Sequence, residues 1–351
     1  MRSRHWEFDR ARESQSDRWR RATALTRVAV PATAVALLLL GACTAGEGKA
    51  AEHPAGARTQ AQQRAAVAHI QGAAVDQKVD WAEVDRAMGR TGKMQDDGAY
   101  KYSMPRSDLH VTVDGVAIEP ALSLGSWLAM KPAASGVIAM GDLVLKESEV
   151  TPVIVKLQEG GVTQTALHNH LLRESPRVMY LHVHGEGDPV KIAATIHAAL
   201  GSTGTPPTPP RSHEVSGPLA IDTAAIDRAL GRGGSASGGV YHITVPRAET
   251  IHAAGVEVTP SMGTATSINF QPTGKGKAAV NGDFVMSADE VNAVIHALED
   301  GGIEVVAVHN HMVGEEPRLF FLHYWANDDA VKLARGLRAA LDRTNARPAR
   351  E

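Results

Sequence analysis

The chain is internally duplicated. Residues 141–200 align with residues 282–341 without a gap, at a constant offset of 141 positions. Self-similarity of this kind indicates one folding unit present in two copies rather than two unrelated halves. The two copies must therefore share a fold, and most residues of one copy have a counterpart in the other.

Histidines are concentrated in the repeated segments. Seven of the chain's 16 histidines fall in two short stretches. Each stretch begins with His-Asn-His and continues with a glutamate, a Pro-Arg pair and a Leu-His pair. The first copy contains His168, His170, Glu174, His182 and His184, and the second contains His309, His311, Glu315 and His323. These imidazoles are the chain's main candidates for chemistry.

Composition excludes some classes of partner. The chain has 351 residues, 43% hydrophobic and 21% charged, which is ordinary for a soluble globular protein of about two domains. A formal net charge of -3 argues against a nucleic-acid binder, which normally presents a basic face. Aromatic residues make up only 4%, which disfavours stacking on single strands. We therefore expect no nucleic-acid partner.

The N-terminal segment resembles a lipoprotein signal. An Arg-rich leader precedes the apolar run Val28 to Leu40, which is followed by Gly41-Ala42-Cys43. A positive region, a short apolar region and small residues are the parts of a secretory signal, and this run is too short to span a bilayer comfortably. The chain's only cysteine then stands at the position that lipidation requires. We expect export and anchoring to the outer face of the cell membrane through lipidated Cys43. An ordinary signal peptide with an incidental cysteine is the alternative.

Composition and pattern divide the chain into five parts. Residues 1–43 form the predicted signal, and residues 44–75, rich in Ala, Gly and Gln, form a flexible tether. The first copy spans 76–202, a Pro-rich linker spans 203–218, and the second copy spans 219–345. With Cys43 committed to lipid, no cysteine remains for a disulfide or a thiolate ligand, so any metal would be held by His and carboxylate.

Each copy predicts an α+β fold. The predicted order is a helix, several strands, a helix, a hairpin and a final helix, with Val150, Val153, Ile154 and Leu157 at the spacing of one helical face. The segments Leu109–Val113 and Val116–Ile118 flank Asp114-Gly115, a strong hairpin signal. We expect two tandem sandwich repeats, each a mainly antiparallel sheet with helices on one face, packed as a pseudo-dimer.

The spacing of the histidines in each His-Asn-His cassette, residues 168–170 and 309–311, suits a metal site. In a strand, residues i and i+2 point to the same face, so His168 and His170 would project together. If the following strand pairs in matching parity, His182 joins them, whereas a one-residue slip would send it to the opposite face. Three such imidazoles can converge on a divalent transition metal such as zinc. Glu174, or Glu315 in the second copy, would complete the set or act as a general base beside bound water.

The two copies differ at one of the candidate ligands. His184 corresponds to Trp325, so the first copy, with up to four imidazoles, is the better predicted metal site. His110 and His252 stay open as extra ligands. Asp142 and Asp283 follow matching glycines and could approach the site, but the favoured interpretation is that they are turn residues that break a strand. Histidines that merely pair with carboxylates or cap backbone groups are the alternative to a metal site.

The string His-Asn-His does not indicate a His-Asn-His nuclease. In those enzymes the three residues are dispersed along a longer ββα unit rather than consecutive. No basic groove is indicated beside the string here. We therefore reject a nuclease.

Several motifs resemble one known family. Val111-Thr112-Val113-Asp114-Gly115-Val116, Gly141-Asp142-Leu143-Val144-Leu145, Ala166-Leu167-His168-Asn169-His170 and Pro176-Arg177-Val178-Met179-Tyr180 resemble the LppY/LpqO lipoprotein family of actinobacteria. The resemblance covers residues from about 76 to 345. It implies an exported, membrane-tethered lipoprotein built on a domain of unknown function, often in two copies. It implies no established activity, substrate or cofactor, and no catalytic residues.

Three functions are compatible with the sequence. The favoured one is a lipid-anchored protein that binds a divalent metal or small ligand through its histidine cassettes. The second is a metal-dependent hydrolase of an envelope substrate, with His168, His170 and His182 as ligands and Glu174 as base. The third is a non-catalytic envelope interaction module with structural histidines. Metal content separates the third from the first two.

Overall fold

The structure is a computed structural model that describes residues 79–208 and 219–349. Both copies belong to one compact unit, Val67–Glu351. The predicted signal, Cys43 and the tether lie outside the described residues. Within the described part, no helix combines the length and apolar character needed to cross a membrane.

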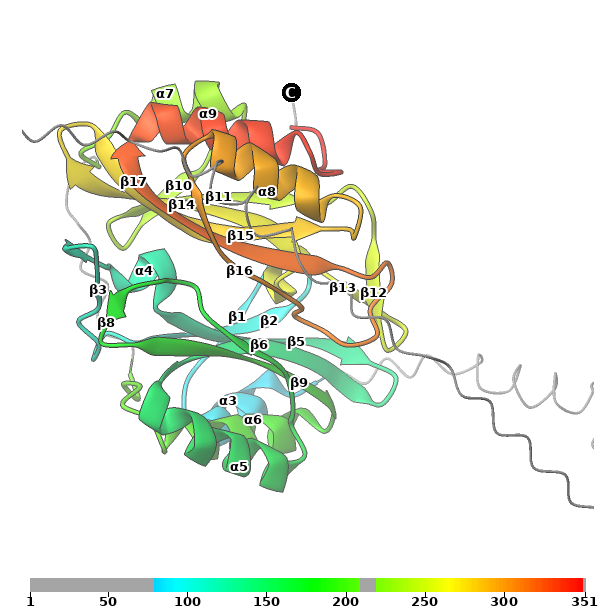
Figure 1. Ribbon diagram of the computed structural model, residues 1–351. Coiled ribbons are helices and arrows are strands. Elements are labelled where there is room, and N and C mark those ends of the chain that lie inside the picture. Colours follow the sequence, from blue (N-terminus) through cyan, green and yellow to red (C-terminus); the bar gives the residue numbers. More distant parts are fainter. Residues whose placement is uncertain (1–78, 209–218, 350–351) are drawn as a thin grey trace, which may run out of the picture. The chain divides into compact units, whose positions relative to one another are not determined.

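Each copy forms a six-stranded antiparallel sheet with the same strand order (Figure 1). The first sheet runs β1(Lys93–Met94), β2(Tyr100–Pro105), β5(Gly125–Ala133), β6(Gly136–Lys146), β9(Val178–Gly187) and β7(Thr163–His168). The second runs β10(Ser235–Ser237), β11(Val240–Pro246), β14(Ala265–Gly274), β15(Lys277–Met286), β17(Phe320–Asp329) and β16(Glu304–His309). The α+β prediction and the duplication are thus confirmed.

Helices cover the outer face of each sheet (Figure 1). They are α3(Trp81–Met88), α5(Val150–Gly160) and α6(Pro189–Leu200) in the first copy, and α7(Thr223–Leu230), α8(Val291–Asp300) and α9(Ala330–Leu341) in the second. The predicted helical spacing is confirmed in α5, which buries Val153 and Leu157. Asp80 caps the start of α3, and left-handed Gly89 ends it.

Short elements connect the main layers. The predicted hairpin forms as β3(Thr112–Val113) and β4(Val116–Ala117), and β3 also pairs with β8(Glu174–Ser175). The second copy has the hairpin β12(Ile251–Ala253) and β13(Val256–Val258). The remaining short helices are α4(Pro120–Ser123), η1(Glu147–Glu149) and η2(Pro260–Met262). The β3–β8 contact ties the segment after the first cassette to the hairpin of its own copy.

Successive side chains of a strand point to opposite faces of the sheet, and both faces of each sheet carry apolar side chains. One face of each sheet packs under its own helices, as Leu143 and Leu145 do against Val153. The other face joins the two copies. Mixed clusters from both copies lie there, one including Tyr180 with Trp325 and another including Met140 with Phe321. The histidine-bearing strands β7, β9, β16 and β17 belong to these facing sheets.

Each copy also contains a buried arginine network. Arg106, fully buried, binds Glu149 at 2.7 Å and Asp108 at 2.8 Å and donates to the Val144 carbonyl. In the second copy Arg247 binds Glu290 at 2.6 Å and Glu249 at 2.8 Å.

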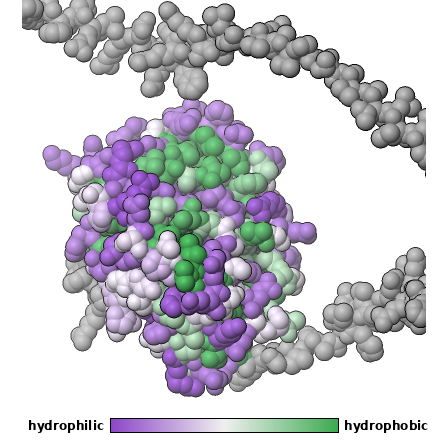
Figure 2. All heavy atoms as spheres, turned by 60° about the horizontal axis from the view of Figure 1, so that its bottom comes forward, coloured by the Kyte–Doolittle hydropathy of each residue, from purple (hydrophilic) through white to green (hydrophobic). Residues whose placement is uncertain are grey.

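The molecular surface mixes hydrophilic side chains with smaller apolar areas, as the face in Figure 2 shows.

Candidate metal centre

The cassettes lie at the ends of the edge strands rather than wholly within them. His168 and His309 are the last residues of β7 and β16, and the second histidine of each cassette follows in the loop. Ala166 pairs with His182 and His168 pairs with Tyr180 across β7 and β9. Of the two registers left open by the sequence, the structure has the one in matching parity, and the His168 and His182 rings stack with centroids 4.8 Å apart.

The histidines of the two copies form one cluster. The rings of His168 and His309 stack with centroids 3.6 Å apart. The ring centroids of His170 in the first copy and His323 in the second are 3.7 Å apart, and those of His182 and His311 are 3.9 Å apart. A shift of 141 positions exchanges these two contacts, which is the reciprocity that a two-fold axis imposes on an interface. The sequence predicted a site within each hairpin, and the structure merges the two.

Two buried aspartates complete the cluster. Asp142 and Asp283 lie within β6 and β15, opposite His182 and His323. The Oδ2 of Asp283 is 3.0 Å from the Nε2 of His311, and the Oδ2 of Asp142 is 3.4 Å from the Nε2 of His170. Their interpretation as turn residues is wrong.

The glycines before these aspartates have a steric role instead. A Cβ on Gly141 would stand 2.6 Å from the Trp127 carbonyl oxygen, and one on Gly282 would stand 2.0 Å from the Ser267 carbonyl oxygen. Glycine is therefore required where the neighbouring strand approaches closely. The strand continues through both Gly-Asp pairs.

Backbone carbonyls fix the orientation of four rings, including His309, whose Nδ1 lies 3.2 Å from the Asn310 oxygen. An imidazole whose Nδ1–H donates to a carbonyl has, when neutral, an unprotonated Nε2. Such second partners are typical of metal-binding histidines. The other three Nδ1 atoms belong to His182, 3.3 Å from the Gly141 oxygen, His323, 2.8 Å from the Gly282 oxygen, and His311, 3.0 Å from the Gly263 oxygen.

The Nε2 atoms of the cluster converge on one another. The Nε2 of His168 is 3.2 Å from that of His323 and 3.1 Å from that of His170. Within the described residues, the Nε2 atoms of His182, His309 and His311 and one oxygen of each aspartate are buried without a hydrogen-bond partner. Buried polar atoms normally have partners, so a cluster of orphaned acceptors requires an explanation.

Burial keeps the imidazoles neutral. It lowers the pKa of His170, His182 and His311 well below the ordinary value, with neighbouring imidazoles acting in the same direction. Burial also lowers the pKa of His323 to about 3, although the charge of Asp283 opposes the shift. Burial and the nearby Asp283 raise the pKa of Asp142 to about 8. Neutral imidazole is the form that binds metal.

Three sets of donors lie close enough to hold a metal ion. They are Asp283 with His309, His311 and His323; His168 with His170 and His323; and His168 with His182 and His309. In each set, the ligand atoms lie within 4.8 Å of one another. Two of the three sets combine the copies.

The structure does not bring the other predicted residues into these sets. Glu174 lies on β8, and buried Glu315 accepts the Leu319 N–H at 3.0 Å. His184, expected to make the first copy the better site, pairs instead with Glu186 at 2.9 Å. His110 and His252 are exposed. Carboxylates from the sheet thus replace the expected loop glutamates, and both copies contribute equally.

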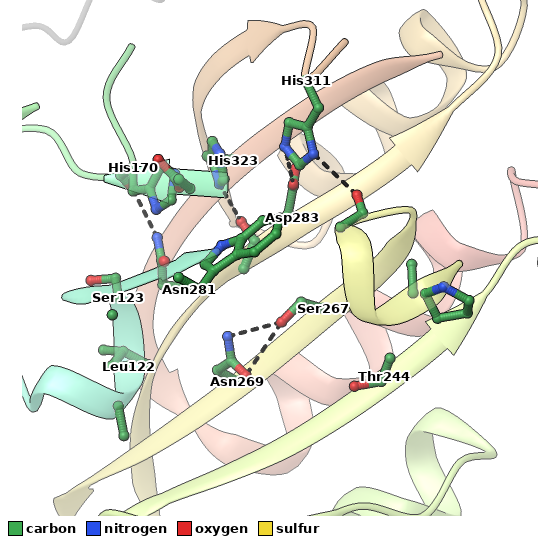
Figure 3. A pocket seen from close by; sticks show the side chains of 18 of the residues that line it. Leu122, Ser123, His170, Thr244, Ser267, Asn269, Asn281, Asp283, His311 and His323 are labelled. Atoms are coloured by element: carbon green, nitrogen blue, oxygen red, sulfur yellow. Dashed lines mark hydrogen bonds and ion pairs between the residues drawn. The ribbon is translucent and has the colours of Figure 1, made fainter. Parts of the chain in front are cut away.

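A cavity of about 280 Å³ opens on the cluster. His170, His182, His311 and His323 line one end with both aspartates. Ser267, Asn269 and Asn281 of the second sheet line another wall, as Figure 3 shows. Lys101 and Trp127 of the first sheet also border it. The sequence did not indicate these wall residues, because they meet only when the two sheets pack together.

These features define a tandemly duplicated α+β protein whose copies share one histidine–aspartate cluster. The model of a family described as "Domain of Unknown Function (DUF1259)" matches residues 82–202 and again residues 224–343. The chain belongs to this family.

Other comparisons are less informative. No curated protein matches the chain. Among solved structures, the trimeric bacterial microcompartment shell protein PduB is 15% identical, over 70% of this chain and 88% of that chain, with a TM-score of 0.17. EtuB from Clostridium kluyveri is 9% identical, over 71% and 90%, also with a TM-score of 0.17. Scores this low support no conclusion about this protein.

Proposed function

We propose that this protein is an exported lipoprotein of the LppY/LpqO type that binds a divalent transition metal at the cluster shared by its copies. The motif resemblance and the position of Cys43 support the anchor. The geometry of the cluster supports the metal.

The observation that carries the proposal is the contact between His311 and Asp283. The Nδ1 of His311 donates to the Gly263 carbonyl, so its Nε2 is an acceptor in the neutral ring. Yet this Nε2 faces a carboxylate oxygen at 3.0 Å. Two buried acceptors at that distance repel each other unless a proton or a metal ion lies between them. Ligand atoms on one tetrahedral zinc ion are separated by roughly 3.3 Å, given bonds of about 2.0–2.1 Å.

The donor set favours zinc or a similar ion. Imidazole nitrogens dominate it, and the only carboxylates are Asp142 and Asp283. Imidazole suits zinc, copper, iron and nickel, whereas calcium and magnesium prefer sites made of oxygen donors. The chain's single cysteine lies at position 43, so thiolate ligands are not part of the proposal.

Metal content of the full chain tests this function. The protein is extracted in detergent, purified without a metal-affinity column and analysed by inductively coupled plasma mass spectrometry. We expect at least one equivalent of transition metal, which His168→Ala combined with His309→Ala removes. The control is His184→Ala, outside the cluster, which retains the metal. Trace metal in the wild type would refute metal binding and favour the interaction module.

The anchor has a separate test. Cys43→Ala should release the exported protein from the membrane fraction, because the attached acyl chains provide the proposed membrane affinity. Metabolic labelling with palmitate should mark the wild type and not the variant. Unlabelled wild-type protein would refute the anchor and leave the metal site unaffected.

Lys101 favours a small anion as a second ligand of the cavity. Its Nζ donates to the Ser261 carbonyl and stands 4.6 Å from the Trp127 ring centroid, and no carboxylate of the described residues lies within 4.0 Å. Burial lowers its pKa to about 8, with Asp97 opposing, so it remains largely protonated near neutral pH. An anion bound in the cavity would neutralise this charge.

Calorimetric titration tests the anion with inorganic phosphate in one arm and malonate in the other. Lys101→Met should weaken binding about tenfold, roughly 1.4 kcal/mol. The matched control Lys131→Met should not, because that lysine lies outside the cavity. A hydrolase that uses Glu174 as base has less support, since Glu174 does not line the cavity beside the cluster.

A further inference from the structure

We propose that the cluster holds two divalent ions and that each ion is bound by residues of both copies. This inference rests on the proposed metal-binding function. It adds the number of ions, and it states that each ion takes one histidine ligand from the opposite copy.

The first ion site is centred on His168. Its Nε2 lies 3.1 Å from that of His170 and 3.2 Å from that of His323. The Oδ2 of Asp142 lies 3.4 Å from the Nε2 of His170. Each of these separations is close to the roughly 3.3 Å expected between ligand atoms on one tetrahedral zinc ion. Three of these donors belong to the first copy, and His323 belongs to the second.

The second ion site follows from the pseudo-two-fold relation. A shift of 141 positions converts the first set into His309, His311, Asp283 and, crossing back to the first copy, His182. The Oδ2 of Asp283 is 3.0 Å from the Nε2 of His311, and the His311 and His182 rings lie 3.9 Å apart. The Nε2 atoms of His182, His309 and His311 are all orphaned among the described residues.

The number of donors favours two ions over one. Six imidazoles and two carboxylates make eight ligands, whereas a structural zinc ion takes four. The donors also separate into two groups, since His168 and His170 share one candidate set and Asp283, His309 and His311 share another. The two aspartates mark opposite ends of the cluster, because each contacts the second histidine of its own cassette. A single ion could be bound by only one of the two aspartates.

His323 could bind either of the two ions. His323 also lies within 4.8 Å of Asp283, His309 and His311, which would make a site confined to the second copy. Its Nε2, however, is 3.2 Å from that of His168, and its ring lies 3.7 Å from that of His170. These short contacts assign His323 to the first ion. Each ion then links the two copies, and neither copy has a complete site alone.

Both ions would border the same cavity. His170 and His323 of the first site and His182 and His311 of the second all line it. Paired metal sites in enzymes typically hold their ions about 3.5–4 Å apart and bind the oxygens of one ligand between them. An oxyanion that spans both ions is therefore the class of ligand that this arrangement fits.

Stoichiometry and conservative variants test the inference in the full-length, detergent-solubilised protein. We expect two ions per chain in the wild type and one in either His182→Gln or His323→Gln. His184→Gln, on the same strand as His182 but outside the cluster, should retain two. Circular dichroism verifies that each variant is folded. A wild type with no metal refutes the proposed function itself, whereas one ion per chain refutes only the paired centre.

Anomalous diffraction from zinc-loaded crystals tests the crossing. In His323→Gln, the ion beside His170 of the opposite copy should disappear, and the ion beside His311 should remain. Loss of the ion beside His311, with retention of the one beside His170, would overturn the crossed assignment. If a variant does not crystallise, cobalt-loaded wild-type protein gives a second measurement. Spin coupling in its electron paramagnetic resonance spectrum supports two adjacent ions, and an uncoupled single-ion signal refutes them.

Discussion

The two copies are alike at the histidine cluster and different beside it. The donors obey the pseudo-two-fold relation, yet the strands behind them do not carry matching side chains. In the first sheet, Trp127 pairs with Asp142 and Ala129 pairs with Met140. At the same register positions of the second sheet, Ser267 pairs with Asp283 and Asn269 pairs with Asn281. One copy thus presents a largely apolar surface, and the other a polar one.

This difference determines what surrounds the proposed ions. Asn281, nearly fully buried, donates through Nδ2 to the His170 and Tyr324 carbonyls, so the second copy holds the first copy's cassette in place. Met140, its counterpart, has no group that can do this. The second cassette is held instead by Thr165, whose hydroxyl donates to the His311 carbonyl. The two copies therefore share the same candidate metal ligands but hold them in place with different hydrogen bonds.

The largest expected difference between the copies concerns their arginine networks. Arg106→Ala would leave Glu149, whose side chain is 6% exposed, with only the exposed Lys146 as a cation, and removing one partner of a buried pair costs about 3–5 kcal/mol. Arg247→Ala should cost less, because its partners Glu290 and Glu249 are 12% and 32% exposed and can be hydrated. Urea unfolding of the two variants measures both losses. Equal losses would show that the networks are energetically equivalent despite their different exposure.

Removal of metal should have the next largest effect, and it should act on both copies together. An ion present at 100 to 1,000 times its dissociation constant stabilises the folded state by about 3–4 kcal/mol. Chelation should therefore lower the melting temperature of the wild type. It should leave the His168→Ala, His309→Ala double variant unchanged, because that variant has no site to empty. A chelator effect of equal size in the double variant would mean that the stabilising ion binds elsewhere.

The sequence predicted the duplication and the fold class, because these depend on local periodicity. It left the shared face of His168 and His182 dependent on the strand register, which the pairing of β7 with β9 supplies. It did not predict the union of the two cassettes, which depends on how the sheets pack. Asp142 was misinterpreted because Gly-Asp is a common turn pair. The available signal was its position directly before an apolar run, Leu143-Val144-Leu145, that recurs as Phe284-Val285-Met286 after the second Gly-Asp pair.

A smaller effect is expected from the asymmetric asparagines. Asn281→Ala leaves the carbonyls of His170 and Tyr324 without this donor, and unsatisfied buried groups cost about 1–3 kcal/mol. Asn269→Ala should cost less, because its partners are the side chains of Ser267 and His242, which can bind water at the cavity wall. Paired denaturation curves measure the difference. A larger loss in Asn269→Ala would show that the cavity wall, rather than the cassette support, stabilises the interface.

The smallest effect is the acid response of the arginine networks. Although burial opposes the shift, hydrogen bonds from Arg247 and Asn345 hold the pKa of Glu249 at about 2, and Arg106 likewise lowers the pKa of Glu149. A carboxyl with a depressed folded-state pKa contributes stability above its unfolded value, near 4.3, and loses it as the pH falls toward the folded value. Unfolding free energies should therefore fall between about pH 4.5 and pH 2. Because Glu249 is partly exposed, Arg247→Ala should flatten this slope less than Arg106→Ala does, and the reverse order would contradict the ranking of the two copies by burial.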